Sequence, residues 1–245
     1  MKIKKQILNL SFLGVLILLF SVGNVHAHAV DIFEKAETAY QQLPTSLTGL
    51  GQFVENYILT GKYSQPHKEE MLFIKNHPDA AFAIANSGCA AMKISYGVCG
   101  INILNNENSR GWSEESDAIR HFTFSALLTC SRGKSLAERY TIAHEGPPPW
   151  TLDNKMDIFN NYQGFDWAQP QYGRCLLPDL EKRLAITALK KIIKKELVVL
   201  VPGDTPCADP LNTLKRIEKM SDEDFHTLMV KTYSDIKKHL PEYCF

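Results

Sequence analysis

The chain has 245 residues, with 27 lysines and arginines against 27 aspartates and glutamates. This balance provides no basic footprint for nucleic acid and no polybasic patch for a membrane surface. The length suffices for a single domain with a hydrophobic core, and no low-complexity linker divides it.

The first 27 residues are typical of a secretory signal peptide. Three lysines precede an apolar run at residues 7–22, and Val25-His26-Ala27 fits a cleavage site. The run is short for the roughly 20 residues that span a bilayer, which favours cleavage over a membrane anchor. Cleavage after Ala29 is an alternative. Removal of residues 1–27 leaves a formal net charge of −3 and predicts an exported protein, either periplasmic or secreted.

All six cysteines follow the predicted cleavage point. An even number in an exported chain predicts disulfides, but the sequence alone does not choose among the many pairings. Cys89 with Cys99 is one local candidate. The sequence has no Cys-x-x-Cys pair, which argues against thiol redox chemistry and a zinc knuckle.

Apolar periodicity and capping residues predict one mainly α-helical domain over residues 28–245. In chain order, we expect helices at 29–43, 68–75, 79–94, 117–131, 135–145, 155–162 and 179–200, with an amphipathic segment at 46–59 and a final helix from the acidic run 221–224 to Leu240. We expect loops at 96–108 and 202–210, and the only strand-like run is 197–201.

Three expectations concern helix ends. Ser135 and Glu138 have the spacing of a capping box. Pro78 suits the first turn of a helix, and the Gly146-Pro147-Pro148-Pro149 run must end one.

Acids, histidines and asparagines are concentrated between Asp117 and Gly164. Asp117 and His121 are four residues apart, which places both on one helix face. A carboxylate in this position can orient an imidazole or share a metal ion with it. Arg120 points about 100° away and can pair with another acid such as Asp157. A helix-surface Asp–His pair is the structural alternative.

His144 and Glu145 lie at the predicted end of the next helix. The helix dipole stabilises a cationic histidine there, so His144 has an explanation without function. The same dipole disfavours Glu145, which suggests that this carboxylate has a metal, an arginine or a substrate as its partner. Glu145 is therefore our preferred general acid or base.

Asp157, Asn160 and Asn161 form a third group at helical spacing. Carboxylate and amide oxygens can bind a hard cation or hold sugar and phosphate hydroxyls. A helix end, with Asn161 or Gly164 as a left-handed cap, explains the pattern equally well. Three tryptophans near these residues are candidates for lining a cleft or, more simply, for core packing: Trp112, Trp150 and Trp167.

The motifs Asp-Ala-x-Arg-His, Ala-His-Glu and Met-Asp-x-x-Asn-Asn-x-x-Gly occur in this order. Together with His77-Pro78, they resemble a small domain family of uncharacterised function (DUF6973-like), which occurs in exported bacterial proteins and at the C-termini of toxin-like proteins. The resemblance covers roughly residues 75–165. One departure is Thr123, a position that is often aromatic in the family. The resemblance implies importance for a set of polar residues but no reaction: Arg120, His121, His144, Glu145, Asp157, Asn160 and Asn161.

Two classes of function follow. The first is an exported, metal-assisted or metal-free hydrolase of peptidoglycan or phospholipid. Its candidate catalytic residues, which are also its candidate metal ligands, are Asp117, His121, Glu145 and Asp157; Arg120, His144, Asn160 and Asn161 would bind substrate. A divalent ion is the one cofactor these residues suggest. The second class is a non-catalytic envelope-binding or structural domain with a buried polar network.

Overall fold

The computed structural model describes residues 25–41, 68–101, 113–172, 179–203 and 205–236. Most of the predicted signal peptide, the segment 46–59, Trp112, Cys175 and Cys244 lie outside these ranges. The described residues form helices and no strand, so the expected mainly α class is confirmed. Among them, no helix is both long and apolar enough to cross a lipid bilayer.

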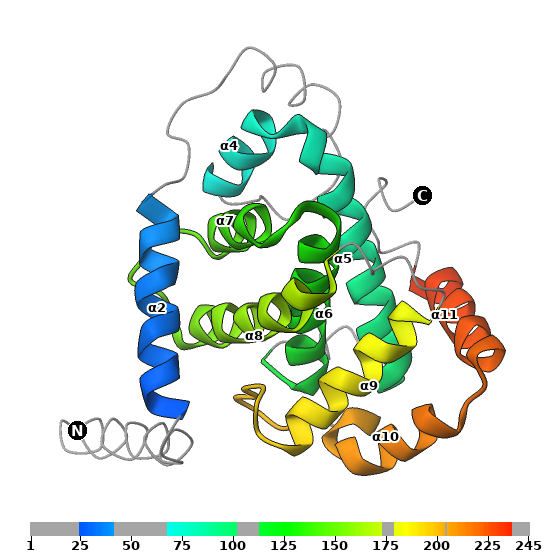
Figure 1. Ribbon diagram of the computed structural model, residues 1–245. Coiled ribbons are helices and arrows are strands. Elements are labelled where there is room, and N and C mark those ends of the chain that lie inside the picture. Colours follow the sequence, from blue (N-terminus) through cyan, green and yellow to red (C-terminus); the bar gives the residue numbers. More distant parts are fainter. Residues whose placement is uncertain (1–24, 42–67, 102–112, 173–178, 204, 237–245) are drawn as a thin grey trace, which may run out of the picture.

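The α-helices are α2 (Val25–Gln41), α4 (Lys68–Asn76), α5 (Pro78–Cys99), α6 (Glu115–Arg132), α7 (Lys134–Glu145), α8 (Leu152–Ala168), α9 (Leu180–Ile193), α10 (Pro210–Lys219) and α11 (Asp222–Ile236). Short 3-10 turns cover Gln169–Gln171 and Pro206–Ala208. Helix α6 is central: it packs against α5, α7, α8 and α9 (Figure 1). A helix that is enclosed on several sides positions its polar residues in the interior, as α6 does with Asp117 and His121.

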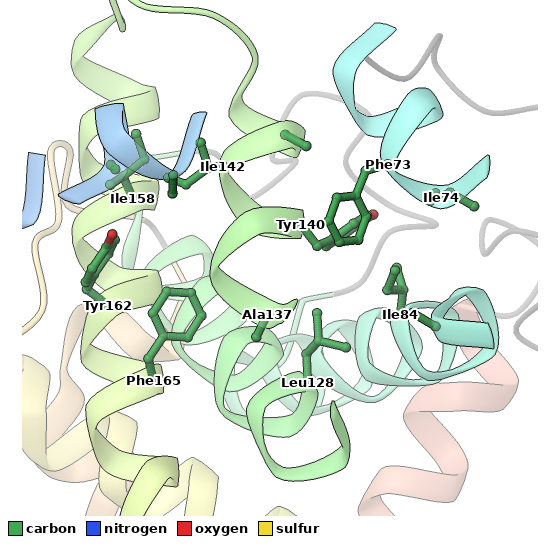
Figure 2. Close-up of a cluster of buried hydrophobic side chains, with 14 of the residues drawn as sticks. Phe73, Ile74, Ile84, Leu128, Ala137, Tyr140, Ile142, Ile158, Tyr162 and Phe165 are labelled. Carbon is green, nitrogen blue, oxygen red and sulfur yellow. The ribbon is translucent and has the colours of Figure 1, made fainter. Parts of the chain in front are cut away.

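Buried apolar side chains form two main clusters. The first joins α2, α4, α7 and α8 with the start of α5 and the later part of α6, and Phe73 of α4 lies beside Tyr140 of α7 (Figure 2). The second lies between α5, α6, α9, α10 and α11 and includes Ile119, Phe122 and Leu189. The polar cluster described below is built on the three helices that these two cores hold in place, α6, α7 and α8.

Helices α6 and α8 approach closely at Gly164. A Cβ atom there would clash with Ser125 Oγ and the carbonyl oxygen of Phe122. Gly164 is therefore an interior packing residue of α8. The expected helix end and left-handed cap at this position were wrong, because α8 continues to Ala168.

Several other helix ends differ from expectation. Helix α5 extends to Cys99 because Gly100, at φ 62°, provides the left-handed cap. The N-cap of α7 is Gly133 without a side-chain hydrogen bond, so the expected capping box at Ser135 is absent. Helix α9 ends at Ile193 rather than 200, and α10 occupies residues that follow the expected loop.

The expected strand 197–201 is instead part of an extended connector between α9 and α10, residues 197–203. Asn160 of α8 clamps it: its Nδ2 donates to Val198 O and its Oδ1 accepts from Val198 N, both at 2.9 Å. The backbone N–H groups of Leu200 and Val201 donate to Ser113 O, at 3.0 and 3.1 Å. The connector thus lies along the N-terminal end of α6 and along α8.

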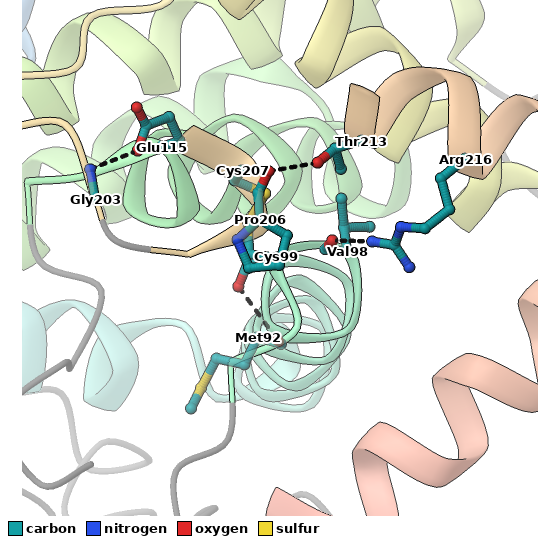
Figure 3. Close-up of a disulfide and its surroundings, with 10 residues drawn as sticks. Met92, Val98, Cys99, Glu115, Gly203, Pro206, Cys207, Thr213 and Arg216 are labelled. Atoms are coloured by element: carbon teal, nitrogen blue, oxygen red, sulfur yellow. Dashed lines mark hydrogen bonds between the residues drawn. A yellow bond between two sulfur atoms is a disulfide. The ribbon is translucent and has the colours of Figure 1, made fainter. Parts of the chain in front are cut away.

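A disulfide between Cys99 and Cys207 fastens the chain beyond the connector to the end of α5 (Figure 3). Nearby, the Arg216 guanidinium donates to Val98 O at 2.5 Å, and Gly203 N donates to Glu115 Oε2 at 3.0 Å. The local pair Cys89–Cys99 is therefore wrong, although Cys89 is itself disulfide-bonded. Helix packing brings Cys99 to a residue 108 positions away, which sequence proximity does not reveal.

Candidate functional site

Three candidate catalytic carboxylates converge on the imidazole of the fourth candidate, His121. Asp117 Oδ1 and Asp157 Oδ1 each lie 3.3 Å from Nε2, and Glu145 Oε1 lies 3.9 Å from Nδ1. Asp117 and His121 share a face of α6, Glu145 is the last residue of α7, and Asp157 belongs to α8. The helical spacing predicted the Asp117–His121 contact, and tertiary packing adds the other two acids.

Asp117 is held from three sides. The guanidinium of Arg120 pairs with its Oδ1, which is also the oxygen nearest His121. Its Oδ2 accepts a hydrogen bond of 2.6 Å from the backbone N–H of Ser113. Burial raises the pKa of Asp117, but the charge of Arg120 and the hydrogen bonds from His121 and Ser113 outweigh burial, so the pKa lies well below its usual range. Asp117 is an ionised anchor for His121 and Arg120.

Glu145 is buried at the end of α7, where Gly146, at φ 72°, and the prolines stop the helix. Its Oε2 accepts a hydrogen bond of 3.1 Å from Asn154, the same residue that completes the capping box of α8 with Thr151. Its Oε1 is buried and has no hydrogen-bond partner among the described residues. Burial raises the pKa of Glu145 to about 7, against the lowering effects of His144 and Asn154.

Asp157 faces His121 from α8, with 15% of its side chain exposed. Its Oδ1 also has no hydrogen bond in the described part of the chain. Burial raises the pKa of Asp157 to about 7; the charge of His121 opposes this, and Glu145 and Asp117 reinforce it. Two carboxyl groups that change protonation near neutrality therefore flank one imidazole.

His144 is the solvent-facing neighbour of this cluster, with half of its side chain exposed and its ring centroid 6.5 Å from that of His121. Its Nδ1 lies 3.2 Å from Glu70 Oε2 on α4. Sequence reasoning missed Glu70. The four-residue spacing of Tyr140 and His144 turns both toward whatever packs on α7, but it does not identify the residue that packs there.

The two asparagines have different environments. Asn160 uses its amide in both directions on Val198, so its observed role is to hold the connector. Asn161 is buried on α8, and its Oδ1 has no hydrogen-bond partner among the described residues. The tryptophans pack in the protein: Trp150 is buried and donates to Gly146 O, and Trp167 lies edge-on to Phe122.

Asp117, His121 and Asp157 form a group that could hold a metal ion, since one potential ligand atom from each lies within 4.8 Å of the others. The oxygen of Asp157 that faces His121 is free of hydrogen bonds from the described residues, as a ligand oxygen would be. Arg120 pairs with Asp117 Oδ1, the same oxygen that lies nearest His121, and would orient it as a ligand. Two carboxylates and an imidazole suit zinc, manganese or iron.

A family model described as "Domain of unknown function (DUF6973)" matches residues 71–196, just over half of the chain. This range contains the whole His121 cluster and ends immediately before the connector. Glu70 lies one residue outside it. No curated protein and no solved structure matches the chain.

Proposed function

The chain belongs to the family described as a domain of unknown function (DUF6973), and from its site we propose that it is a hydrolase that uses Glu145 and Asp157 as general acid and base around His121. The observation that carries this proposal is the pair of buried carboxyl oxygens without hydrogen bonds from the described residues, Glu145 Oε1 and Asp157 Oδ1. Burying a carboxyl oxygen without a hydrogen bond is costly, and both of these oxygens face the imidazole of His121. Perturbed carboxyl groups gathered around a histidine are typical of proton-transfer sites.

Each residue has a role in this scheme. Asp157, the more exposed of the pair, takes a proton from the attacking water, and Glu145 donates one to the leaving-group oxygen. His121 lies between them and returns the proton from Asp157 to Glu145 after each turnover. Asp117 fixes His121, and Arg120 keeps Asp117 ionised.

The cell envelope is the proposed location of the substrate, peptidoglycan or phospholipid. Two observations support export. The N-terminal sequence has the pattern of a signal peptide, and the described cysteines are all in disulfides, which persist in oxidising compartments. Cleavage after Ala27 would keep Ile32, Ala36 and Ala39, which anchor α2 to the core.

A metal-assisted version of the same reaction is the second candidate, supported by the ligand geometry of Asp117, His121 and Asp157. A bound divalent ion would supply an activated water at neutral pH. Elemental analysis of the purified mature chain, with calorimetric titration of Zn²⁺ and Mn²⁺, tests this version. A stoichiometric ion whose removal abolishes turnover supports it; full activity in a metal-free protein rules it out.

The experiment for the hydrolase compares Glu145→Gln and Asp157→Asn with the wild type in a peptidoglycan zymogram and a phospholipid-release assay. Each variant keeps the shape of the residue and removes its proton transfer, so we expect kcat to fall on the order of 100-fold or more with the fold retained. Asp166→Asn is the matched control, because Asp166 lies on the exposed side of α8, the helix that also carries Asp157, and pairs with Lys134.

A non-catalytic domain with a buried polar network is the alternative, and the clamp of Asn160 on the connector and the Asp117–Arg120 pair favour it. It predicts a different outcome. Wild-type protein would release nothing in either assay, and Glu145→Gln would change only stability. Turnover by the wild type that both site variants lose contradicts this alternative.

A further inference from the structure

Helix α4 brings Glu70 against α7. Glu70 Oε1 accepts a hydrogen bond of 2.5 Å from the Tyr140 hydroxyl, and Oε2 lies 3.2 Å from His144 Nδ1. The two partners are four residues apart and present the same face of α7. Only 11% of the Glu70 side chain is exposed. Both oxygens of this buried carboxylate are thus used to hold two side chains of the neighbouring helix.

The neighbouring aromatic residues fix this arrangement. The rings of Tyr140 and His144 stack with centroids 6.4 Å apart, and Phe73 packs edge-on against Tyr140 (Figure 2). The guanidinium of Arg139 lies over the ring of Phe73. Glu70 therefore reaches His144 from a rigid part of the first apolar core rather than from a loop.

The contact decides which nitrogen of His144 remains available for other partners. With Nδ1 committed to Glu70, the nitrogen left for other partners is Nε2, on a side chain that is half exposed and 6.5 Å from His121 by ring centroid. A carboxylate that holds one imidazole nitrogen sets the tautomer and orientation of the ring.

The groups that face His144 come from four helices: Glu70 from α4, His121 from α6, Tyr140 and Glu145 from α7, and Asp157 from α8. Of these, Glu70 is the one that makes an ion pair with the ring. The others either stack on it or act at longer range.

We propose that Glu70 is a positioning residue of the site, which holds Nδ1 of His144 and thereby presents Nε2–H as the donor to a substrate oxygen. This inference rests on the proposed hydrolase, and it extends the site beyond the region that the family model covers. It also assigns His144 a place at the solvent edge of the cluster, where a substrate oxygen would first meet a donor.

The test uses the mature chain labelled with ¹⁵N-histidine, followed by NMR from pH 5 to 9. In the wild type, we expect Nδ1 of His144 to carry a proton directed at Glu70. Glu70→Gln removes the charged acceptor of that proton, so we expect the ¹⁵N signals of both ring nitrogens of His144 to change. Glu69→Gln is the matched control: Glu69 is adjacent, and it contacts Tyr40 instead. Unchanged His144 signals in Glu70→Gln would overturn the proposal.

The kinetic arm measures kcat and KM on whichever envelope substrate the wild type hydrolyses. Glu70→Gln is expected to lower kcat on the order of 10- to 100-fold with little change in KM, because the His144 donor is no longer held in place. A residue with only a structural role would not produce this split between kcat and KM, and an unchanged kcat counts against the proposal.

One further variant, read together with the assays above, separates the possible failures. Tyr140→Phe keeps the ring stack and removes one hydrogen bond to Glu70, so a smaller shift of His144 is expected even if Glu70→Gln folds poorly. If the wild type hydrolyses nothing while the His144 shift is present, the hydrolase fails and the control of His144 by Glu70 stands. If the wild type hydrolyses the substrate and the His144 shift is absent, the hydrolase stands and the control of His144 by Glu70 fails.

Discussion

The carboxylate of Asp117 is the anion of the site that contacts two basic side chains, because its Oδ1 lies against both Arg120 and His121. The other oxygen is occupied by the backbone of Ser113, whose own carbonyl accepts hydrogen bonds from the connector. A change at this residue therefore reaches both the chemistry and the packing of residues 197–203.

Asp117→Asn is expected to lower the free energy of unfolding by about 2 kcal/mol or more at neutral pH. The substitution removes the ionised carboxylate with which the largely buried Arg120 pairs through Oδ1. Urea denaturation at pH 7 measures the loss. Asp153→Asn is a control on an exposed neighbour that also contacts Ser113; an equal loss in both variants would contradict a special role for Asp117.

Residue spacing predicted part of the site. The Asp117–His121 face and the anomaly of an acid at the end of α7 could both be read from local sequence, because both follow from helix geometry and the helix dipole. Glu70 could not, because its partners lie 70 and 74 positions along the chain and only the packing of α4 on α7 joins them. Asn160 looked like a ligand, and the structure gives its amide to a backbone segment that no periodicity connects to α8.

At the scale of elements, the contact between α6 and α8 depends on the missing side chain of Gly164. Gly164→Ala is expected to destabilise the protein by roughly 1–3 kcal/mol or more, because the new methyl group would meet Ser125 and the α6 backbone. Thermal denaturation followed by circular dichroism measures it.

The matched variant is Gly88→Ala, in the interior of α5. A Cβ there meets only Phe124 at an ordinary contact distance of 3.9 Å. Only the higher helix propensity of alanine then acts, so we expect Gly88→Ala to raise the free energy of unfolding by about 0.5–1 kcal/mol. The same sign for the two variants would contradict the packing role of Gly164.

The helices themselves were largely predictable, and their ends were less so. The apolar periodicity of α2, α4, α6 and α7 fixed their positions to within a few residues. Helix α8 was cut short because Gly164 resembles a terminator, and whether a glycine ends a helix or permits close packing depends on the neighbouring helix. The disulfide partner of Cys99 could not be predicted either, because it too depends on how distant parts of the chain pack together.

At the scale of the whole molecule, the two raised carboxyl pKa values link stability to pH. Burial raises the pKa of Glu145 from 4.5 and that of Asp157 from 3.8, each to about 7. Between about pH 4 and 7 the folded chain then binds more protons than the unfolded chain, so the free energy of unfolding falls as pH rises. Asp117, with its lowered pKa, acts in the opposite sense below about pH 4.

We expect stability to decrease from pH 5 to 8 by on the order of 2 kcal/mol, and Glu145→Gln to reduce that slope because a neutral amide replaces a titrating acid. Denaturant unfolding at four pH values across this range measures both. A wild-type stability that rises across the range, or an equal slope in the variant, would contradict the assignment.

The Cys99–Cys207 disulfide is a second contribution to the stability of the whole molecule. Replacing both cysteines by serine is expected to lower the free energy of unfolding by about 2–4 kcal/mol, since the bond closes a loop of more than a hundred residues. The double variant isolates this bond, whereas a reductant would also attack those of Cys89 and Cys130. An unchanged unfolding midpoint would show that the loop is constrained by other means.

That same bond has a topological consequence for proteolysis. Asp117, His121, Glu145 and Asp157 all lie inside the loop that Cys99 and Cys207 close, whereas Glu70 lies outside it. A protease that cuts once between residues 133 and 172 would leave both pieces covalently joined, with α6 and α8 still packed on each other. Nicked protein would run as one species on a gel without reductant and separate only after reduction.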